Sequence, residues 1–368
     1  MKNTRIKLIC LVLFPFSLLI NHFFSKYPHI VDTYYSSGIN KSFIQGLSTI
    51  TGIFPFSLFE IGLFIIVPLA IFYVFYSIIK ICQDHKKRKV RFLNFLLTLS
   101  ASFSLIYFLF LSTWGLNYNR PHLSKTIHLP TKKYTTDELS ELYAYLVYEV
   151  NSLSNYTVRS EEDYMIIPGD NKDILKRARL GYINASKYFP SLAGNYGDPK
   201  PILASEFMNY TGIAGIYFPF TAEPNVNIAI VDSSIPSTAM HEMAHQRGYA
   251  NEDECNFIAF LTCSMHPDVD YRYSGYLLAL NYTASALAKN DSNTLAVLNQ
   301  NLSPRVRNDL SHLRNHNKKY EGKIETISLK VNDTYLKANG IADGEKSYGR
   351  MVDLLLSYYQ LYIKKETS

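Results

Sequence analysis

Three long apolar stretches in the first third of the chain constrain its fold more than any other feature. They cover about residues 6–24, 53–79 and 92–111. Each offers close to the ~20 mostly apolar residues that a helix needs to cross ~30 Å of hydrocarbon. A cleaved signal peptide is the alternative for the first stretch alone, but that stretch lacks a clean small-residue cleavage site. The sequence therefore predicts a membrane anchor of three transmembrane helices within residues 1–116, with the lipid bilayer as a partner.

Basic residues in the short connecting segments predict the orientation of these spans. They gather before the first span and in the loop between the second and third, which reads KICQDHKKRKVRF. Loops rich in Lys and Arg remain on the cytoplasmic side. We therefore expect a multi-pass cell-membrane protein with a cytoplasmic N-terminus and with residues 117–368 outside the cytoplasm. This topology accounts for much of the net charge of +6, and no motif for nucleic-acid binding accompanies that charge.

Glu60 is the one acidic residue inside a proposed span. An intramembrane carboxylate is a candidate for function by default. Its position near the outer end of the span equally suits a side chain that reaches the interface or pairs with another helix. The sequence leaves the role of Glu60 open.

The sequence of residues 117–368 predicts one soluble α+β domain with far more helix than strand. A capping box at Thr135 and Glu138 opens its first helix. The segments PILASEF, GIYFPF and NVNIAIV are short, rich in β-branched and aromatic residues, and predict a small antiparallel sheet. Helical periodicity then resumes near residues 238–247, 252–264, 271–289, 303–322 and 346–363.

An HExxH motif, His241 to His245, lies at the start of this helical half. Two histidines four residues apart project from one face of a helix, so both imidazoles can bind one metal ion. Glu242 can take a proton from a metal-bound water, whose pKa is lowered towards 7 by Zn2+. The alternative is an amphipathic helix with two surface histidines. The motif follows a strand and lies on a helix that Ser237 or Thr238 is expected to cap, which favours the zinc site.

A catalytic zinc site needs a third protein ligand. The following residues, 251–256, read NEDECN and offer two candidates. Glu252 is followed four residues later by Asn256, a spacing at which the second residue can orient the first. Glu254 lacks such a partner, and Asn251, at the third-ligand position of the HExxHxxGxxH pattern, is a poor zinc ligand. The spacing favours Glu252 and keeps Glu254 as the alternative.

Two other segments are candidates for substrate contacts. NVNIAIV could bind an extended peptide as an edge strand, through backbone hydrogen bonds, or could equally be an ordinary core strand. In the late segment KANGIADGEKSYGRMVDLLLSYY, Tyr348 or Arg350 is a candidate to stabilise the oxyanion of a tetrahedral intermediate.

Several strings of the sequence resemble one bacterial membrane protein family, domain of unknown function 3810. They are WGLNYNR, GIYFPFTAEPNVN, HEMAHQRG, EDECNFIAFLTC and SYGRMVDLLL. The resemblance covers most of the chain and implies a bacterial protein with N-terminal spans and a zincin-like HExxH domain. The family has no established substrate. The stretch from Glu252 to Asn256 is also similar to other zincin groups in which the first Glu is the third ligand, although its short separation from His245 departs from them.

Together these features predict a membrane-anchored zinc metallohydrolase, a gluzincin-like peptidase that acts on peptides or proteins at the outer face of the cell envelope. A membrane sensor or regulator is an alternative, but little cytoplasmic sequence is available to transmit a signal. An inactive zincin scaffold that binds a ligand without hydrolysis is another, against which the intact His241, Glu242 and His245 argue. No pattern in the sequence assigns an oligomeric state or a cleavage specificity.

Overall fold

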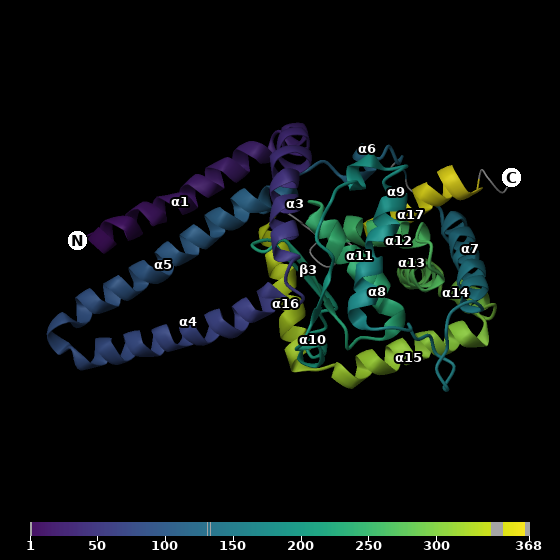
Figure 1. Ribbon diagram of the computed structural model, residues 1–368. Coiled ribbons are helices and arrows are strands. Elements are labelled where there is room, and N and C mark those ends of the chain that lie inside the picture. The colour runs from purple at the N-terminus through teal and green to yellow at the C-terminus, as the bar shows by residue number, and fades with distance from the viewer. Residues whose placement is uncertain (1, 131, 133, 340–348, 365–368) are drawn as a thin grey trace.

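Three long helices project from one side of a mostly helical body (Figure 1). The computed structural model describes residues 2–130, 132, 134–339 and 349–364. The projecting helices are α1 (Lys2–Ser25), α4 (Leu58–Gln83) and α5 (Arg88–Thr113). Each is long and apolar enough to cross a membrane. Most of their large apolar side chains are exposed, as expected for helices that face lipid.

The segment between α1 and α4 is helical as well. It forms α2 (Pro28–Ile30), η1 (Val31–Ile39) and α3 (Asn40–Thr51), and α3 runs across the base of the three long helices (Figure 1). One side of α3 is buried against the body through Ile44 and Ser48. This segment therefore belongs to the packed structure. A short 3-10 turn, η2 (His85–Lys87), joins α4 to α5 at the far end.

Helices make up most of the rest of the body. The capping box at Thr135 is present and opens α7, as the sequence predicts. In chain order the helices of the body are η3 (Gly115–Asn119), α6 (Leu123–Thr126), α7 (Thr136–Ser154), α8 (Asn171–Arg177), α9 (Arg179–Ala185), η4 (Pro190–Leu192), α10 (Ser205–Asn209), η5 (Asp232–Ser234), α11 (Ile235–Gln246), α12 (Glu252–Ser264), α13 (Val269–Asn290), α14 (Ser292–Asn299), α15 (Pro304–Tyr320), α16 (Lys323–Ala338), α17 (Gly349–Tyr358) and η7 (Tyr359–Ile363).

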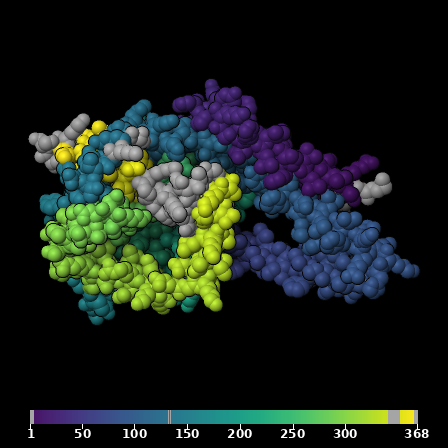
Figure 2. All heavy atoms as spheres, turned by 180° about the vertical axis from the view of Figure 1, so that it is seen from behind, coloured from purple at the N-terminus to yellow at the C-terminus, as the bar shows by residue number. Residues whose placement is uncertain are grey.

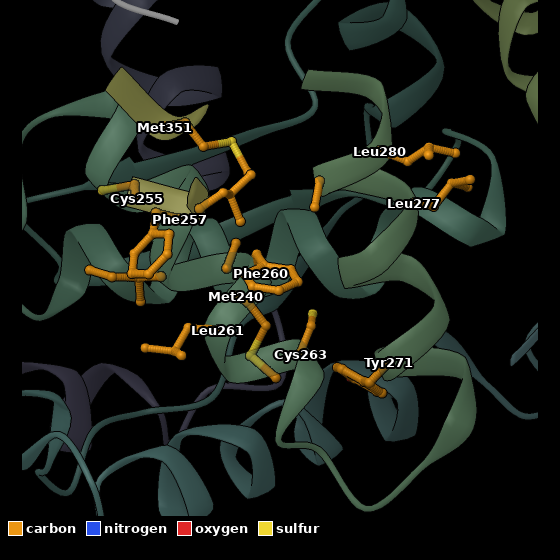
Figure 3. Packing of buried hydrophobic residues seen from close by; sticks show 14 of the residues in the cluster. Met240, Cys255, Phe257, Phe260, Leu261, Cys263, Tyr271, Leu277, Leu280 and Met351 are labelled. Atoms are coloured by element: carbon orange, nitrogen blue, oxygen red, sulfur yellow. The ribbon is translucent and has the colours of Figure 1, made fainter. Parts of the chain in front are cut away.

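The hydrophobic core lies where α11, α12, α13 and α17 meet. Figure 3 shows Met240 of α11, Phe260 of α12, Tyr271 of α13 and Met351 of α17 packed together. All four side chains are at most 2% exposed. Fully burying a large apolar side chain stabilises the fold by about 1.5–3 kcal/mol. The core therefore holds α11 and α12 firmly against each other, and these two helices carry the HExxH motif and the acidic residues that follow it.

A three-stranded sheet covers one side of α11. Its strands are β1 (Lys200–Ile202), β2 (Gly215–Phe218) and β3 (Glu223–Asn227), in the order β1-β3-β2. β2 and β3 are antiparallel as predicted, whereas β1 is parallel to β3. The expectation of a wholly antiparallel sheet is therefore wrong for β1, because the chain passes through α10 and β2 before β3 pairs with β1. The α+β fold class itself is confirmed.

The position of β3 decides between the two interpretations of NVNIAIV. Every residue of β3 is buried, and the strand lies between its two neighbours. Only the first part of NVNIAIV is strand, and it is a core strand. The free edge next to α11 belongs to β2.

Two carboxylates join α4 to the sheet. Glu60, in the first turn of α4, accepts hydrogen bonds from the backbone N–H groups of Leu203, at 2.9 Å, and Ala204, at 2.7 Å. Glu223 of β3 accepts in return from Leu58 N at 3.2 Å and Phe59 N at 2.9 Å. Glu60 is thus paired with protein backbone at the base of the span.

Candidate metal centre

The HExxH motif lies on α11, which begins one turn earlier than the sequence predicts. Ile235 is its first residue and Ser234 its N-cap, so neither Ser237 nor Thr238 caps the helix. Pro236 lies in the first turn, where its missing N–H leaves no bond unmade. The helix ends just before Gly248, which has a φ of +78°, a conformation that glycine adopts without strain.

Three side chains of α11 and α12 converge on one point. His241, His245 and Glu252 each offer a ligand atom, and these atoms all lie within 4.8 Å of one another. The two histidine Nε2 atoms are 3.1 Å apart. Glu252, the first residue of α12, places one carboxylate oxygen 3.1 Å from His241 Nε2 and the other 3.6 Å from His245 Nε2. The structure thus brings together the three residues that the sequence names as ligands.

The hydrogen-bond partner of each Nδ1 selects the tautomer of that imidazole. His245 Nδ1 lies 2.8 Å from the carbonyl oxygen of Tyr249, which can only accept, so Nδ1 carries the proton. His241 Nδ1 lies 2.8 Å from Oδ1 of Asn256, whose amide nitrogen donates to the Tyr282 hydroxyl at 2.9 Å. In the neutral tautomers that these contacts select, both Nε2 atoms turn their lone pairs towards each other. Such facing lone pairs repel unless a cation or a proton lies between them.

The spacing of the donors fits a zinc ion. Ligand atoms bound to one tetrahedral zinc at ~2.0–2.1 Å lie about 3.3 Å apart. The two Nε2 atoms lie 3.1 Å apart, and each lies 3.1 or 3.6 Å from a different oxygen of the Glu252 carboxylate, so the carboxylate faces both histidines. Burial opposes ionisation of Glu252, but His245 and His241 outweigh that effect and hold its pKa below the usual value. Two neutral imidazoles and a carboxylate are a donor set that suits zinc.

The other acidic candidate lies elsewhere. The Glu254 carboxylate accepts a hydrogen bond from the backbone N–H of Leu123 at 2.9 Å and lies 3.2 Å from His122 Nδ1. It therefore binds the start of α6. Asn256 also differs from its expected role, since its side chain contacts His241 directly rather than Glu252.

Glu242 lies beside the cluster and is 5% exposed. Burial raises the pKa of its carboxyl group. Gly215 of β2 passes so close that a Cβ atom there would lie 2.5 Å from Glu242 Oε1. Only glycine leaves room for the carboxylate at this point of the strand. This contact aligns the edge of the sheet with the HExxH helix. No pattern in the sequence indicates that Gly215 lies beside Glu242.

A cavity of about 560 Å³ opens over the cluster. Its walls come from the edge strand β2, from the end of α5 and from α16. A second cavity of about 310 Å³ shares residues 212–214 with the first and extends towards α15. The space-filling view shows the surface hollowed between α15 and α16 (Figure 2). The two cavities adjoin at residues 212–214, just before β2, and we call them together the groove.

Two tyrosines in the cavity wall have no counterpart in the sequence-based prediction. The Tyr118 hydroxyl donates to the Tyr335 hydroxyl at 3.2 Å, and both residues line the larger cavity. Burial, followed by the effects of Tyr335 and Glu252, raises the pKa of Tyr118 well above its usual value, so it stays protonated. Tyr348 lies outside the described residues. Of Arg350, only the backbone in α17 is described.

The residue that follows α5 contacts the candidate metal centre directly. The Trp114 indole N–H donates to the carbonyl oxygen of His245 at 3.0 Å, and its ring lies 5.7 Å from that of Tyr217. Arg120 forms a hydrogen bond with Asp32 at 2.6 Å and packs over the ring of Tyr249, with 4.3 Å between the guanidinium carbon and the ring centre. The segments that flank the spans therefore support His245 and Tyr249, the residue behind its imidazole.

Comparison with known proteins gives one match. No curated protein and no solved structure matches the chain. A family model described as a protein of unknown function, DUF3810, matches residues 35–356, which include α4, α5 and the whole candidate metal centre. The chain therefore belongs to the DUF3810 family of proteins of unknown function.

Proposed function

We propose that this protein is a membrane-anchored, zinc-dependent metallohydrolase of the zincin type. In this proposal it is a peptidase that cleaves peptides or proteins at the outer face of the cell envelope. The observation that carries the proposal is the convergence of His241, His245 and Glu252. Their donor atoms face one another at metal-ligand spacing beside the buried carboxyl group of Glu242 and beneath an open cavity. Structural and catalytic metals are both held by such donors, but an open cavity suits catalysis.

In this proposal the metal and the side chains of the protein have separate roles in the reaction. Zinc, when bound, would supply a Lewis acid that activates water and polarises the scissile carbonyl group. Glu242 takes the proton of the attacking water and returns it to the leaving amine. Because burial raises the pKa of Glu242, this carboxyl group is better matched to both transfers near neutral pH.

Tyr335 stabilises the negative charge that develops on the carbonyl oxygen. The Tyr118 hydroxyl donates to Tyr335, which leaves the Tyr335 proton available for a substrate oxygen. A preorganised donor of this kind is worth about 2.7–4 kcal/mol in a transition state. Tyr118 acts as a positioning residue through Tyr335.

An extended polypeptide is the substrate that best suits the groove. The edge of β2 that is not paired with β3 lies beside Glu242, and an extended chain can add to such an edge as a further strand. With the cytoplasmic N-terminus that the basic loops predict, the groove faces the outside of the cell.

Zinc content of the purified full-length protein tests the metal site. We expect about one zinc per chain in the wild type and in the matched control Glu254→Ala. His245→Ala and Glu252→Ala should lose the metal. The proposal would be overturned if the folded wild-type protein bound no zinc when zinc was supplied in excess.

A second variant tests hydrolysis. Glu242→Gln should retain zinc but lose cleavage of a peptide library by a factor of about 100 or more. If this variant binds zinc and the wild type cleaves no peptide, the inactive scaffold or the sensor replaces the peptidase.

A further inference from the structure

Exposed apolar side chains gather at the side of the body from which the three long helices leave. Large apolar residues in water are costly, by about 25 cal/mol for each Å² exposed, so a concentration of them marks a contact surface. They come from the segment of α3, from the α10 region and from α16. We call this set the basal collar, and its members are Ile39, Phe43, Ile50, Leu203, Phe207, Ile324, Ile327 and Val331.

Three contacts place the basal collar at the ends of the spans. Leu203 is held by its backbone hydrogen bond to Glu60 in the first turn of α4. The ring of Phe110, near the end of α5, lies 6.4 Å from the ring of Tyr335 on α16. The Asn40 side chain of α3 donates to the carbonyl oxygen of Thr113, the last residue of α5. Both views place α16 at the edge of the body from which the spans project (Figures 1 and 2).

The pattern of α16 is that of a helix at a lipid interface. Ile324, Ile327 and Val331 recur at a spacing of three and four, which puts them on one stripe, and they are 59%, 62% and 64% exposed. Leu336, on the opposite side, is buried in the body. The helix therefore presents an apolar stripe away from the protein to which it is attached.

Basic residues flank this stripe along one side. Seven residues make nearly two turns, so side chains at that spacing fall on one line. Lys323, Lys330 and Lys337 are spaced in this way, and Lys337 also pairs with Asp333 on the same helix at 2.6 Å. Lysines beside an apolar stripe lie along acyl chains and reach the phosphate groups of lipids.

We propose that α16 lies in the interface of the bilayer that the three spans cross. Its apolar stripe contacts the acyl chains, and its lysines bind the phosphates of anionic phospholipids. The rest of the basal collar enters the same interface through α3 and the α10 region. Since other residues of α16, among them Asn332 and Tyr335, line the cavity over the candidate metal centre, the groove opens beside the lipid headgroups. This inference concerns membrane contact and does not depend on zinc or on hydrolysis.

Spin-label accessibility in the full-length protein tests the contact. Ile327→Cys is labelled in a background of Cys10→Ser and Cys82→Ser, because the two remaining cysteines are buried. Val297→Cys is the matched control, since Val297 is 61% exposed and belongs to α14, a helix on the side of the body away from the spans (Figure 1). Both proteins are placed in nanodiscs made with and without phosphatidylglycerol.

We expect the label at residue 327 to be relaxed by oxygen and shielded from a water-soluble nickel chelate, and the label at residue 297 to show the reverse. Lys330→Gln should raise nickel-chelate access at residue 327 only in nanodiscs with phosphatidylglycerol. Equal nickel-chelate access at both positions would overturn the proposal. So would shielding at residue 327 from both reagents, which indicates contact with protein.

Discussion

Each imidazole of the candidate metal centre has a hydrogen-bond acceptor on its far side. Asn256 holds His241, and the carbonyl oxygen of Tyr249 holds His245. Such outer contacts fix the tautomer that leaves Nε2 free and reduce the freedom that each ring would lose on binding a metal. The Cys255 Sγ also lies 3.4 Å from His245 Nδ1. The contact to His241 comes from the Asn256 side chain, so it can be removed by substitution without altering the backbone.

We expect Asn256→Ala to weaken zinc affinity by a factor of about 10–100, because His241 loses the contact that orients it. Competition with a metal chelator measures the affinity of the full-length protein. Asn315→Ala, an exposed change on α15, is the control and should leave affinity unchanged. Equal affinity in both variants would mean that Asn256 does not position the ligand.

A second expectation concerns Gly215. Because a methyl group there would lie 2.5 Å from Glu242 Oε1, Gly215→Ala must displace the carboxylate or the strand. Cleavage should fall by a factor of about 100 or more while zinc content stays at the wild-type level. Gly46→Ala is the control, since nothing lies within 4 Å of a Cβ atom at that position. Wild-type cleavage by Gly215→Ala would contradict the assignment of Glu242 as the proton acceptor.

Two carboxylates, one on α4 and one on β3, join α4 to the sheet. Glu60 of α4 binds the backbone after β1, while Glu223 of β3 binds the backbone at the start of α4. Glu223 also pairs with Lys200, and both side chains are at most 7% exposed. A helix N-terminus favours a negative charge, so Glu223 stabilises the first turn of the span as well as the sheet.

Glu223→Gln should lower the free energy of unfolding by about 3–5 kcal/mol, because it leaves the Lys200 ammonium buried without its counter-charge. Thermal unfolding of the full-length protein in nanodiscs is the measurement. Glu161→Gln, an exposed carboxylate between α7 and α8, serves as the control. A melting temperature that falls equally in the two variants would show that the buried pair contributes nothing specific.

At the scale of the whole molecule, the anchor and the body form a continuous structure. Trp114, at the end of α5, donates to the carbonyl oxygen of His245, and α3 packs against the body through buried residues. Leaving a buried acceptor without its donor costs about 1–3 kcal/mol. The anchor thus contributes to the stability of the metal site as well as to its location.

We therefore expect the fragment 117–368, produced alone, to bind zinc more weakly and to exchange the amide hydrogens of α11 faster than the full-length protein. Hydrogen exchange followed by mass spectrometry gives both the rate and the location of the change. Co-expression with fragment 1–116 should restore slow exchange. An isolated 117–368 fragment with full zinc affinity would show that the body is independent of the anchor.

Those parts that depend on neighbouring residues in the chain were predicted from the sequence. Crossing a bilayer needs only length and apolarity, so the sequence alone predicts three helices that can span one, and the structure has α1, α4 and α5 there. The spacing of His241 and His245 on a helix is likewise local, and so is the capping box at Thr135. Glu252 was preferred to Glu254 by its spacing from Asn256, and the structure brings Glu252 to the histidines although Asn256 contacts His241 instead.

Only the tertiary structure decided the contacts between distant parts of the chain. Tyr118 and Tyr335 meet across 217 positions. Tyr118 belongs to the string WGLNYNR, but nothing in that string marks it as a residue of the site. The parallel pairing of β1 depends on the path of the chain through α10 and β2. α16 was not predicted, because its apolar stripe faces away from the core and few of its residues are buried. Local sequence patterns indicate which secondary structure a segment can form. Which surfaces then pack together depends on the free energy of the whole folded chain.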